Sequence, residues 1–271
     1  QFLVTAFVTE TCQGTWPDAI SSLISLAEKS QVGQELFLRW CLMLTERIAS
    51  QRPQPRTDST HQQNTKVRDF LRLGDNGKLT ALWKRILQSS TTCSVSTCLA
   101  LECFAQFAHW IDVSLVVETE TLKLIYTHLQ SDNASIQLAA SDCLAEVVTK
   151  GMQVSDKIAL AAYMNLDSVF TAVGERGMVD AFFGRVCKIL NNLGFSLIFA
   201  LQNQSIARAQ VIDWCSTSLL PHLLRFSNVL AQSAQKNLLA AHESSLWSEA
   251  LASLLPVSTS FFELARSCKE D

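Results

Sequence analysis

Three charged residues line up beside a cysteine in the segment 140–152. Asp142, Glu146 and Lys150 are four residues apart, a spacing that puts them on one side of a helix, and Cys143 adjoins them. A thiol becomes reactive where a neighbouring cation favours its thiolate. The apolar periodicity instead puts Cys143 on a wide packed face, and no partner is spaced to activate it. The segment therefore predicts a packing helix with a polar edge.

The remaining thiols and imidazoles also predict no chemical site. The nine cysteines are odd in number, none forms a C-x-x-C pair, and most lie in apolar helical patterns, which favours free buried thiols in a reducing compartment over disulfides or zinc. The five histidines are scattered, without another metal-ligand type at i, i+4. We expect no metal and no cofactor.

Catalytic motifs are equally absent from the sequence. There is no G-x-S-x-G and no H-E-x-x-H, and Gly77-Lys78-Leu79-Thr80 lacks the serine or threonine that follows the lysine of a phosphate loop. The sequence therefore predicts a binding protein and no enzyme.

Positive charge gathers in one part of an otherwise acidic chain. Between residues 47 and 85 there are nine basic and three acidic side chains, a net charge of +6 in a chain whose total is −3. Such clustering attracts phosphates. A solvated loop and helix surface is the alternative from charge alone. The basic residues are Arg47, Arg52, Arg56, Lys66, Arg68, Arg72, Lys78, Lys84 and Arg85.

The elements that must position these residues are helices. The chain is 48% hydrophobic and 17% charged, it has few glycines and prolines, and no apolar run is long enough to span a membrane. Amphipathic periodicity predicts short-linked helices, and the polar, proline-containing segment 51–63 is predicted to be a loop. The helices are expected at 2–12, 17–30, 33–49, 64–73, 78–89, 94–108, 116–130, 134–150, 155–165, 177–201, 206–219, 222–240 and 243–268.

Paired, these helices make units of roughly 40 residues, the length of HEAT or armadillo repeats. A compact helical bundle is the alternative. Several helices are apolar on more than one side, as stacking between repeats requires, so we expect an all-α solenoid across residues 1–271, with about six helix pairs.

Several stretches, in order, resemble the exportin-t family of importin-β-type karyopherins, the nuclear export receptors for tRNA. Residues 7–26 resemble the Trp-centred helix pair of exportin-type karyopherins, and residues 109–129, 139–160 and 186–201 are similar to exportin-t. The final 70 residues fit by helical pattern alone, and Ser141 stands where the family has a cysteine. The matching motifs are Trp110-Ile111-Asp112, Ser141-Asp142-Cys143-Leu144-Ala145-Glu146, Lys150-Gly151-Met152 and Asp156-Lys157.

The resemblance implies a right-handed HEAT superhelix, with A helices outside and B helices lining the concave side. It implies a segment of a longer monomeric receptor, beginning after the first repeats. Such a receptor binds mature tRNA cooperatively with Ran-GTP. It crosses the nuclear pore by contacts with nucleoporin FG repeats, and so shuttles between nucleus and cytoplasm, with no membrane partner.

The tRNA-binding hypothesis joins the basic stretch to the resemblance. Arg68-Asp69 and Arg72 lie where the family has a basic-Asp pair and a further arginine. A karyopherin for protein cargo and a non-transport HEAT scaffold are the alternatives. The predicted tRNA contacts are Lys66, Arg68, Arg72, Lys84 and Arg85, with Lys150 and Lys157 secondary.

Overall fold

The computed structural model is built of helices throughout the part of the chain that it describes. That part comprises residues 1–49, 58–89, 94–108, 110–111, 115, 118–150, 152–203, 208–236 and 241–267, and it contains no strand. The chain divides into two compact units, Gln1–Glu146 and Val147–Asp271. The predicted all-α solenoid is therefore confirmed, while the superhelical hand and the placement of the layers stay predictions.

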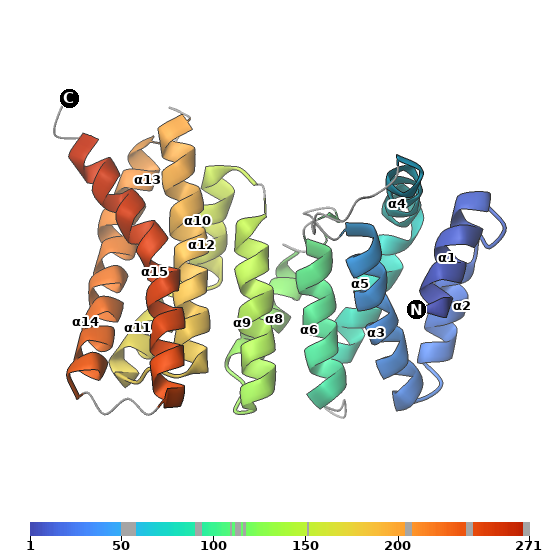
Figure 1. Cartoon of the computed structure of the whole chain (residues 1–271), viewed down its shortest axis with the longest axis horizontal. Helices are drawn as coiled ribbons and strands as arrows, with labels where there is room; N and C mark the ends of the chain where they lie inside the picture. Colours follow the sequence, from blue (N-terminus) through green and yellow to red (C-terminus); the bar gives the residue numbers. More distant parts are fainter. Residues whose placement is uncertain are drawn as a thin grey trace. The chain divides into compact units, whose positions relative to one another are not determined.

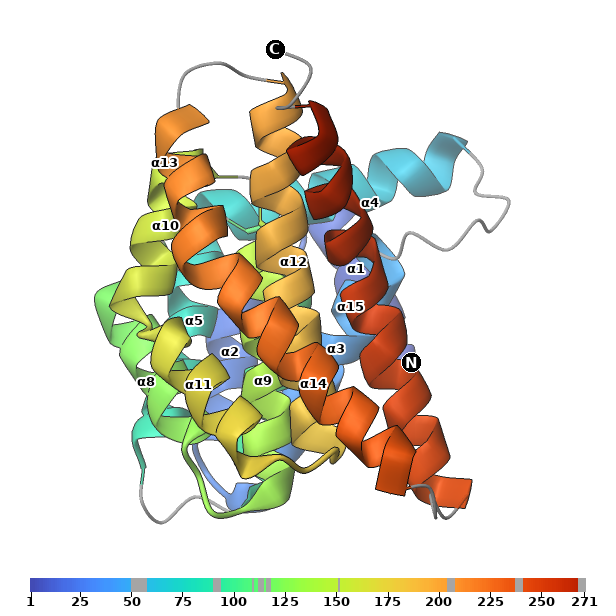
Figure 2. The same cartoon turned by 90° about the vertical axis from the view of Figure 1, so that its left-hand side faces the viewer.

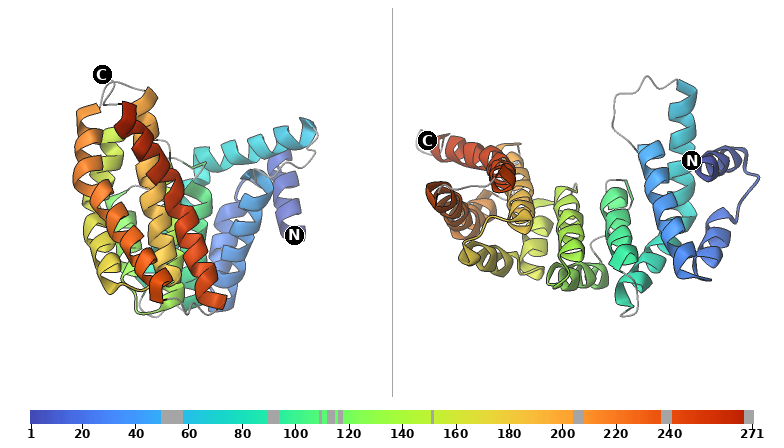
Figure 3. Two further views of the ribbon diagram at one scale, coloured as in Figure 1. Left: turned by 60° about the vertical axis from the view of Figure 1, so that its left-hand side comes forward. Right: turned by 60° about the horizontal axis from the view of Figure 1, so that its bottom comes forward.

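The first unit stacks its helices in two layers (Figure 1). Helices α2, α5 and α8 follow one another in one layer, α3 and α6 lie side by side in the other, and α2–α3 and α5–α6 pack as pairs. Helix α4 packs on α1 and α3 (Figure 3), and the π-helix η1 continues it into α5. The bounds are α1 Phe2–Gln13, α2 Ala19–Ala27, α3 Gln31–Ala49, α4 Asp58–Phe70, η1 Leu71–Asp75, α5 Asn76–Gln88, α6 Ser94–Ala108, α8 Thr119–Leu129 and α9 Ala134–Thr149.

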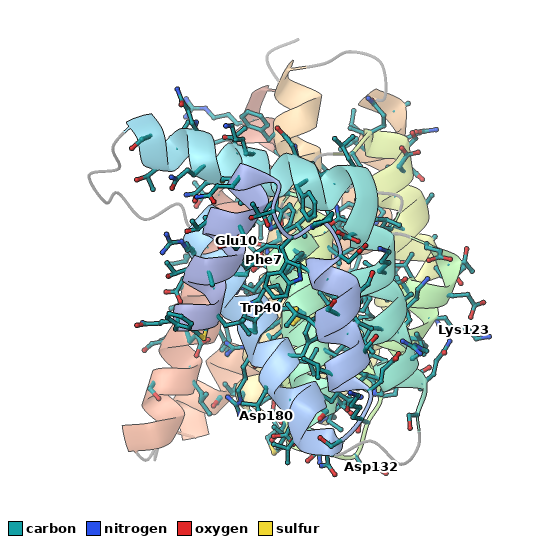
Figure 4. The ribbon with its side chains drawn as sticks, turned by 90° about the vertical axis from the view of Figure 1, so that its right-hand side faces the viewer. Phe7, Glu10, Trp40, Lys123, Asp132 and Asp180 are labelled. Carbon is teal, nitrogen blue, oxygen red and sulfur yellow. The ribbon has the colours of Figure 1, made fainter. Side chains whose placement is uncertain are left out.

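Aromatic rings hold the first unit together. Phe7 and Trp40 pack edge to face, with ring centroids 5.1 Å apart (Figure 4), and the ring of Phe70 in α4 lies 6.4 Å from that of Phe7. Burying side chains of this size contributes about 2–3 kcal/mol each from apolar burial. Because Phe70 belongs to this cluster, the apolar core fixes α4 and the basic residues along it.

The second unit repeats the two-layer arrangement. Helix α12 lies along α15 in one layer, α11 packs on α14 in the other, and α13, η2 and α14 form one continuous, bent helix (Figure 2). The bounds are α10 Val154–Tyr163, α11 Leu166–Arg176, α12 Ala181–Asn203, α13 Arg208–Trp214, η2 Cys215–Leu219, α14 Leu220–Lys236 and α15 Ala241–Ser267.

The predicted packing role of Cys143 is confirmed. Cys143, Leu144, Ala145, Val147 and Val148 of α9 are all fully buried. Burial raises the pKa of the Cys143 thiol, and the nearby carboxylates of Glu146 and Asp142 raise it further. The thiol therefore stays protonated and unreactive at neutral pH.

Four parts of the predicted helix pattern are wrong. The loop prediction fails for 58–63, because α4 begins at Asp58, and residues 51–57 lie outside the described part. Helix α11 was not predicted: it starts after Asn165, whose φ of 46° separates it from α10. The predicted breaks after residues 73 and 219 are instead continuous π-helical turns, η1 and η2. Pro221 lies two residues after η2, where its missing N–H disturbs regular α-helical bonding.

Candidate nucleic-acid interface on helix α4

Helix α4 is anchored by its inner face. Asn64, Val67 and Leu71, at helical spacing, are buried against the neighbouring helices. The Asn64 side-chain amide donates to the Arg47 carbonyl at 3.2 Å, which ties α4 to the last turn of α3. The outer and flanking positions of α4, where the basic residues lie, therefore face solvent.

Three of the predicted contacts gather on α4 and η1. Lys66 is exposed on the outer face, and Arg68 is half-buried on the flank, where it donates to the Thr65 hydroxyl at 3.2 Å. The buried Arg68 Nε has no hydrogen-bond partner within the described residues. Because that nitrogen is buried, any contact of Arg68 with a ligand would come from the rest of its half-buried guanidinium group.

Arg72 combines a structural contact with an exposed charge. Its Nε donates to the Trp110 carbonyl at 2.9 Å, which joins η1 to the end of α6. Its side chain is 48% exposed, and the nearest guanidinium nitrogen is 3.9 Å from the Asp69 carboxylate. An exposed pair at that distance contributes little stability, so the Arg72 charge is weakly compensated.

Lys84 and Arg85 have another role in the structure. Lys84 Nζ is 2.5 Å from a Glu118 carboxylate oxygen, just before α8, and Arg85 pairs with Glu28, just after α2. These two adjacent residues join α5 to both neighbours in its layer. Both cations are paired with carboxylates, so they are not counted among the contacts proposed below, and their prediction as tRNA contacts stays untested. The sequence did not show this because both carboxylates are far away along the chain.

Lys157, a secondary predicted contact, is buried in the structure. It is 6% exposed, and its ammonium donates to the Val148 carbonyl and the Ser196 hydroxyl, each at 2.9 Å. Burial lowers the pKa of Lys157. A buried lysine in this position fastens the end of α9 to α10 and α12, and its ammonium is not presented to a ligand. Lys150, half-buried just after α9, stays a secondary prediction.

Fewer of the basic residues between positions 47 and 85 thus remain candidates for contact with RNA. Lys78 pairs with Asp75 at 2.8 Å, and Arg52 and Arg56 lie outside the described part of the chain. Arg47, which is exposed in the last turn of α3, was counted in the stretch but not among the contacts. The Asn64 hydrogen bond to its carbonyl places it beside α4. We call Arg47, Lys66, Arg68 and Arg72 the α4 basic group.

A metal site and a membrane-spanning helix were also sought among the described residues. No three histidine, cysteine, aspartate or glutamate side chains there are grouped to hold a metal ion. Among the same residues, no helix combines the length and apolarity needed to cross a membrane.

Comparison with known proteins places the chain in a family. The model of the family described as "Exportin 1-like protein" matches residues 1–144. That is more than half of the chain, and the chain belongs to this family.

Individual relatives show which members of this family the chain is similar to. The chain is 31% identical over 218 residues to Exportin-T of Homo sapiens, covering 78% of this chain and 22% of the relative. Exportin-T of Vanderwaltozyma polyspora is 28% identical over 189 residues, with 68% and 17% covered. Exportin-T of Danio rerio is 28% identical over 189 residues, with 68% and 19% covered. The resemblance to the exportin-t family is thus confirmed, and the chain spans about a fifth of these relatives' length.

Solved structures add little. An engineered protein from the Northeast Structural Genomics Consortium aligns with 91% of this chain and 92% of its own at 15% identity, with a TM-score of 0.43. A score at this level carries no argument about fold or function.

Proposed function

We propose that the chain is a segment of a nuclear export receptor that binds mature tRNA together with Ran-GTP. The observation that carries the proposal is the membership of the Exportin 1-like family, combined with the three relatives described above, each of which is named Exportin-T. The receptor would pass the pore by contacts with nucleoporin FG repeats and shuttle between nucleus and cytoplasm.

The helical solenoid suits cooperative loading. Each repeat touches only its neighbours, so small adjustments spread over many repeats can change the curvature of the whole receptor. If tRNA and Ran-GTP favour the same curvature, each raises the affinity for the other by the same factor.

The α4 basic group is suited to an RNA cargo that is recognised without reading its base sequence. Double-stranded RNA is bound mainly through its shape, phosphates and 2′-hydroxyls. An exposed cation such as Lys66, and the charge of the half-buried Arg68, would meet phosphates without selecting a sequence. We therefore propose that the α4 basic group contacts the tRNA backbone.

Neutralising two of these cations in the full-length receptor tests the interface. The variant Lys66→Gln/Arg68→Gln removes two charges that have no acidic partner in the described residues. If both contact phosphates, tRNA affinity falls and the slope of log K against log salt becomes shallower by about 2, since each phosphate contact contributes about 0.9.

The chain supplies matched controls for this titration. Lys123→Gln removes an exposed charge from α8, well away from α4 (Figure 4), and Lys84→Gln removes a cation already paired with Glu118. Neither should change the slope. An unchanged slope in the double variant, or an equal change in Lys123→Gln, would remove α4 from the interface.

A receptor for protein cargo is the second candidate. It is favoured by one observation: the fold pairs Lys78, Lys84 and Arg85 with carboxylates, which leaves fewer unpaired cations for RNA than the sequence shows. A full-length receptor that binds no tRNA, with or without Ran-GTP, would select this alternative.

A further inference from the structure

The guanidinium group of Arg72 ties the junction of α4 and η1 to the end of α6. Its Nε donates to the Trp110 carbonyl at 2.9 Å, across 38 positions of the chain. The acceptor lies just after Ala108, the last residue of α6, where backbone carbonyls have no partner within the helix. A cation is favourable at this end because it meets the negative end of the helix dipole. Arg72 therefore caps α6 from a neighbouring element.

The acceptor of this hydrogen bond is held firmly in the core. Trp110 is 6% exposed, and its ring centroid lies 4.7 Å from that of Phe107, whose ring is 4.8 Å from that of Trp83 in α5. Trp110 also belongs to the motif by which the chain resembles exportin-t. Because this carbonyl is attached to the aromatic packing of α5 and α6, a change in the Arg72 bond acts directly on that packing.

The same guanidinium group has capacity for an external anion. The Arg72 side chain is 48% exposed, and its pair with the exposed Asp69 carboxylate, at 3.9 Å, contributes little. A planar guanidinium carries five N–H donors, so Nε can serve a carbonyl while the terminal amino groups meet a phosphate. Arg68 differs, because it donates to Thr65 within its own helix.

We infer that Arg72 acts as a positioning residue, which couples RNA binding at α4 to the packing of η1 against the end of α6. The bond to Trp110 orders the long side chain in advance, so less conformational freedom is lost when a phosphate binds. By reciprocity, a bound phosphate holds the guanidinium group against the carbonyl. The inference rests on the proposed function and deepens it, because it gives a route by which cargo binding alters the packing between helices.

Two substitutions in the full-length receptor separate the charge of Arg72 from its planar set of donors. Arg72→Lys keeps the charge, but an ammonium group does not reproduce the guanidinium geometry that serves two acceptors. We expect this variant to bind tRNA about two- to tenfold more weakly, the cost of ordering one long side chain, with an unchanged slope of log K against log salt. Arg72→Gln removes the charge, so its slope should become shallower by about 0.9.

Hydrogen exchange at the end of α6 measures the coupling itself. The amides of Trp110 and Ile111 both donate to the Phe107 carbonyl, at 3.1 and 3.0 Å, so their exchange reports the opening of this turn. Saturating tRNA should slow their exchange in the wild-type receptor by about two- to tenfold, the same factor as in binding, because coupling is reciprocal. In Arg72→Lys, tRNA should leave this exchange unchanged.

Lys66→Gln is the matched control within the same basic group. Lys66 is exposed on α4 and makes no hydrogen bond or ion pair in the described part of the chain. Its substitution should weaken tRNA binding, yet at saturation tRNA should still slow exchange at Trp110 and Ile111 as in wild type. Circular dichroism of both variants without tRNA checks that their helices unfold at the same temperature as those of the wild type.

Two results would overturn the inference. Wild-type slowing of exchange in Arg72→Lys would show that RNA affects the end of α6 without this hydrogen bond. Unchanged exchange in the wild-type receptor at saturating tRNA would show that there is no coupling, and that result does not depend on the folding of any variant. The proposed function survives both results, because tRNA still binds. A wild-type receptor that binds no tRNA would overturn the function and the inference together.

Discussion

Substituting Gly194 by alanine should loosen the second unit, because α12, η2 and α15 meet closely at this residue. A Cβ at Gly194 would lie 2.7 Å from Val257 Cγ2 and 2.9 Å from Leu219 Cδ1. Carbon atoms pack optimally at about 3.5–4.0 Å, so the helices must move apart. Both neighbours are fully buried, and valine is stiff at χ1, so neither can turn away easily.

Two opposing effects set the size of the change. Overpacking of this kind costs about 1–3 kcal/mol, and replacing glycine by alanine inside a helix contributes up to about 1 kcal/mol in return. Because two of the contacts are buried and shorter than 3.0 Å, the cost of overpacking should exceed the gain in helix propensity. We expect Gly194→Ala to lower the free energy of unfolding by about 1–2 kcal/mol.

Gly184 supplies the matched control in the same helix. A Cβ there would have no other atom within 4 Å, so Gly184→Ala should show the helix-propensity gain alone and stabilise the unit by up to about 1 kcal/mol. Urea unfolding followed by far-ultraviolet circular dichroism measures both variants, and hydrogen exchange in α12 and α15 localises the effect. Equal stability of the two variants would refute the close packing described for Gly194.

Two further predictions concern titratable groups. Burial lowers the pKa of His222 against the opposing effect of Asp167, whose carboxylate accepts from its Nε2 at 2.9 Å. The folded state then binds fewer protons than the unfolded state, so the free energy of unfolding should fall as the pH falls below about 6.5. His222→Gln should weaken this dependence in urea titrations at several pH values, and a variant with the wild-type slope would contradict the assignment. Among the thiols, burial raises the pKa of Cys215 to about 11 and that of Cys143 as well. A thiol reagent should therefore label the partly exposed Cys12 well before either in the native protein, and early labelling of Cys143 would show that α9 is not packed as described.

The sequence predicted most of the helices because their signals are local. Helix α6 has the predicted bounds, 94–108, and the position of Cys143 in the core followed from the 3.6-residue period alone. Helix α11 was missed because its separation from α10 depends on the left-handed conformation of one residue, Asn165. Asparagine adopts that conformation more readily than most residues, but its presence does not require it.

The candidate site was predicted less well because charge pairing is not local. Lys84 and Arg85 looked available until the fold placed Glu118 and Glu28 beside them. Lys157 was a candidate because its segment resembles the exportin-t family, and only the packing of α10 against its neighbours shows that it is buried. Lys66 was placed correctly on an exposed position because it lies opposite the apolar stripe of its own helix, which the sequence does show.

Binding of tRNA to the full-length receptor, with and without Ran-GTP, is the most direct test of the proposed function. We expect Ran-GTP to strengthen tRNA binding at least about fivefold, with an equal effect of tRNA on the affinity for Ran-GTP, because coupling free energies are reciprocal and typically about 1–3 kcal/mol. Ran-GDP should have no such effect. The same tRNA dissociation constant with and without Ran-GTP, or no binding of tRNA in either state, would contradict a role as a Ran-dependent tRNA export receptor.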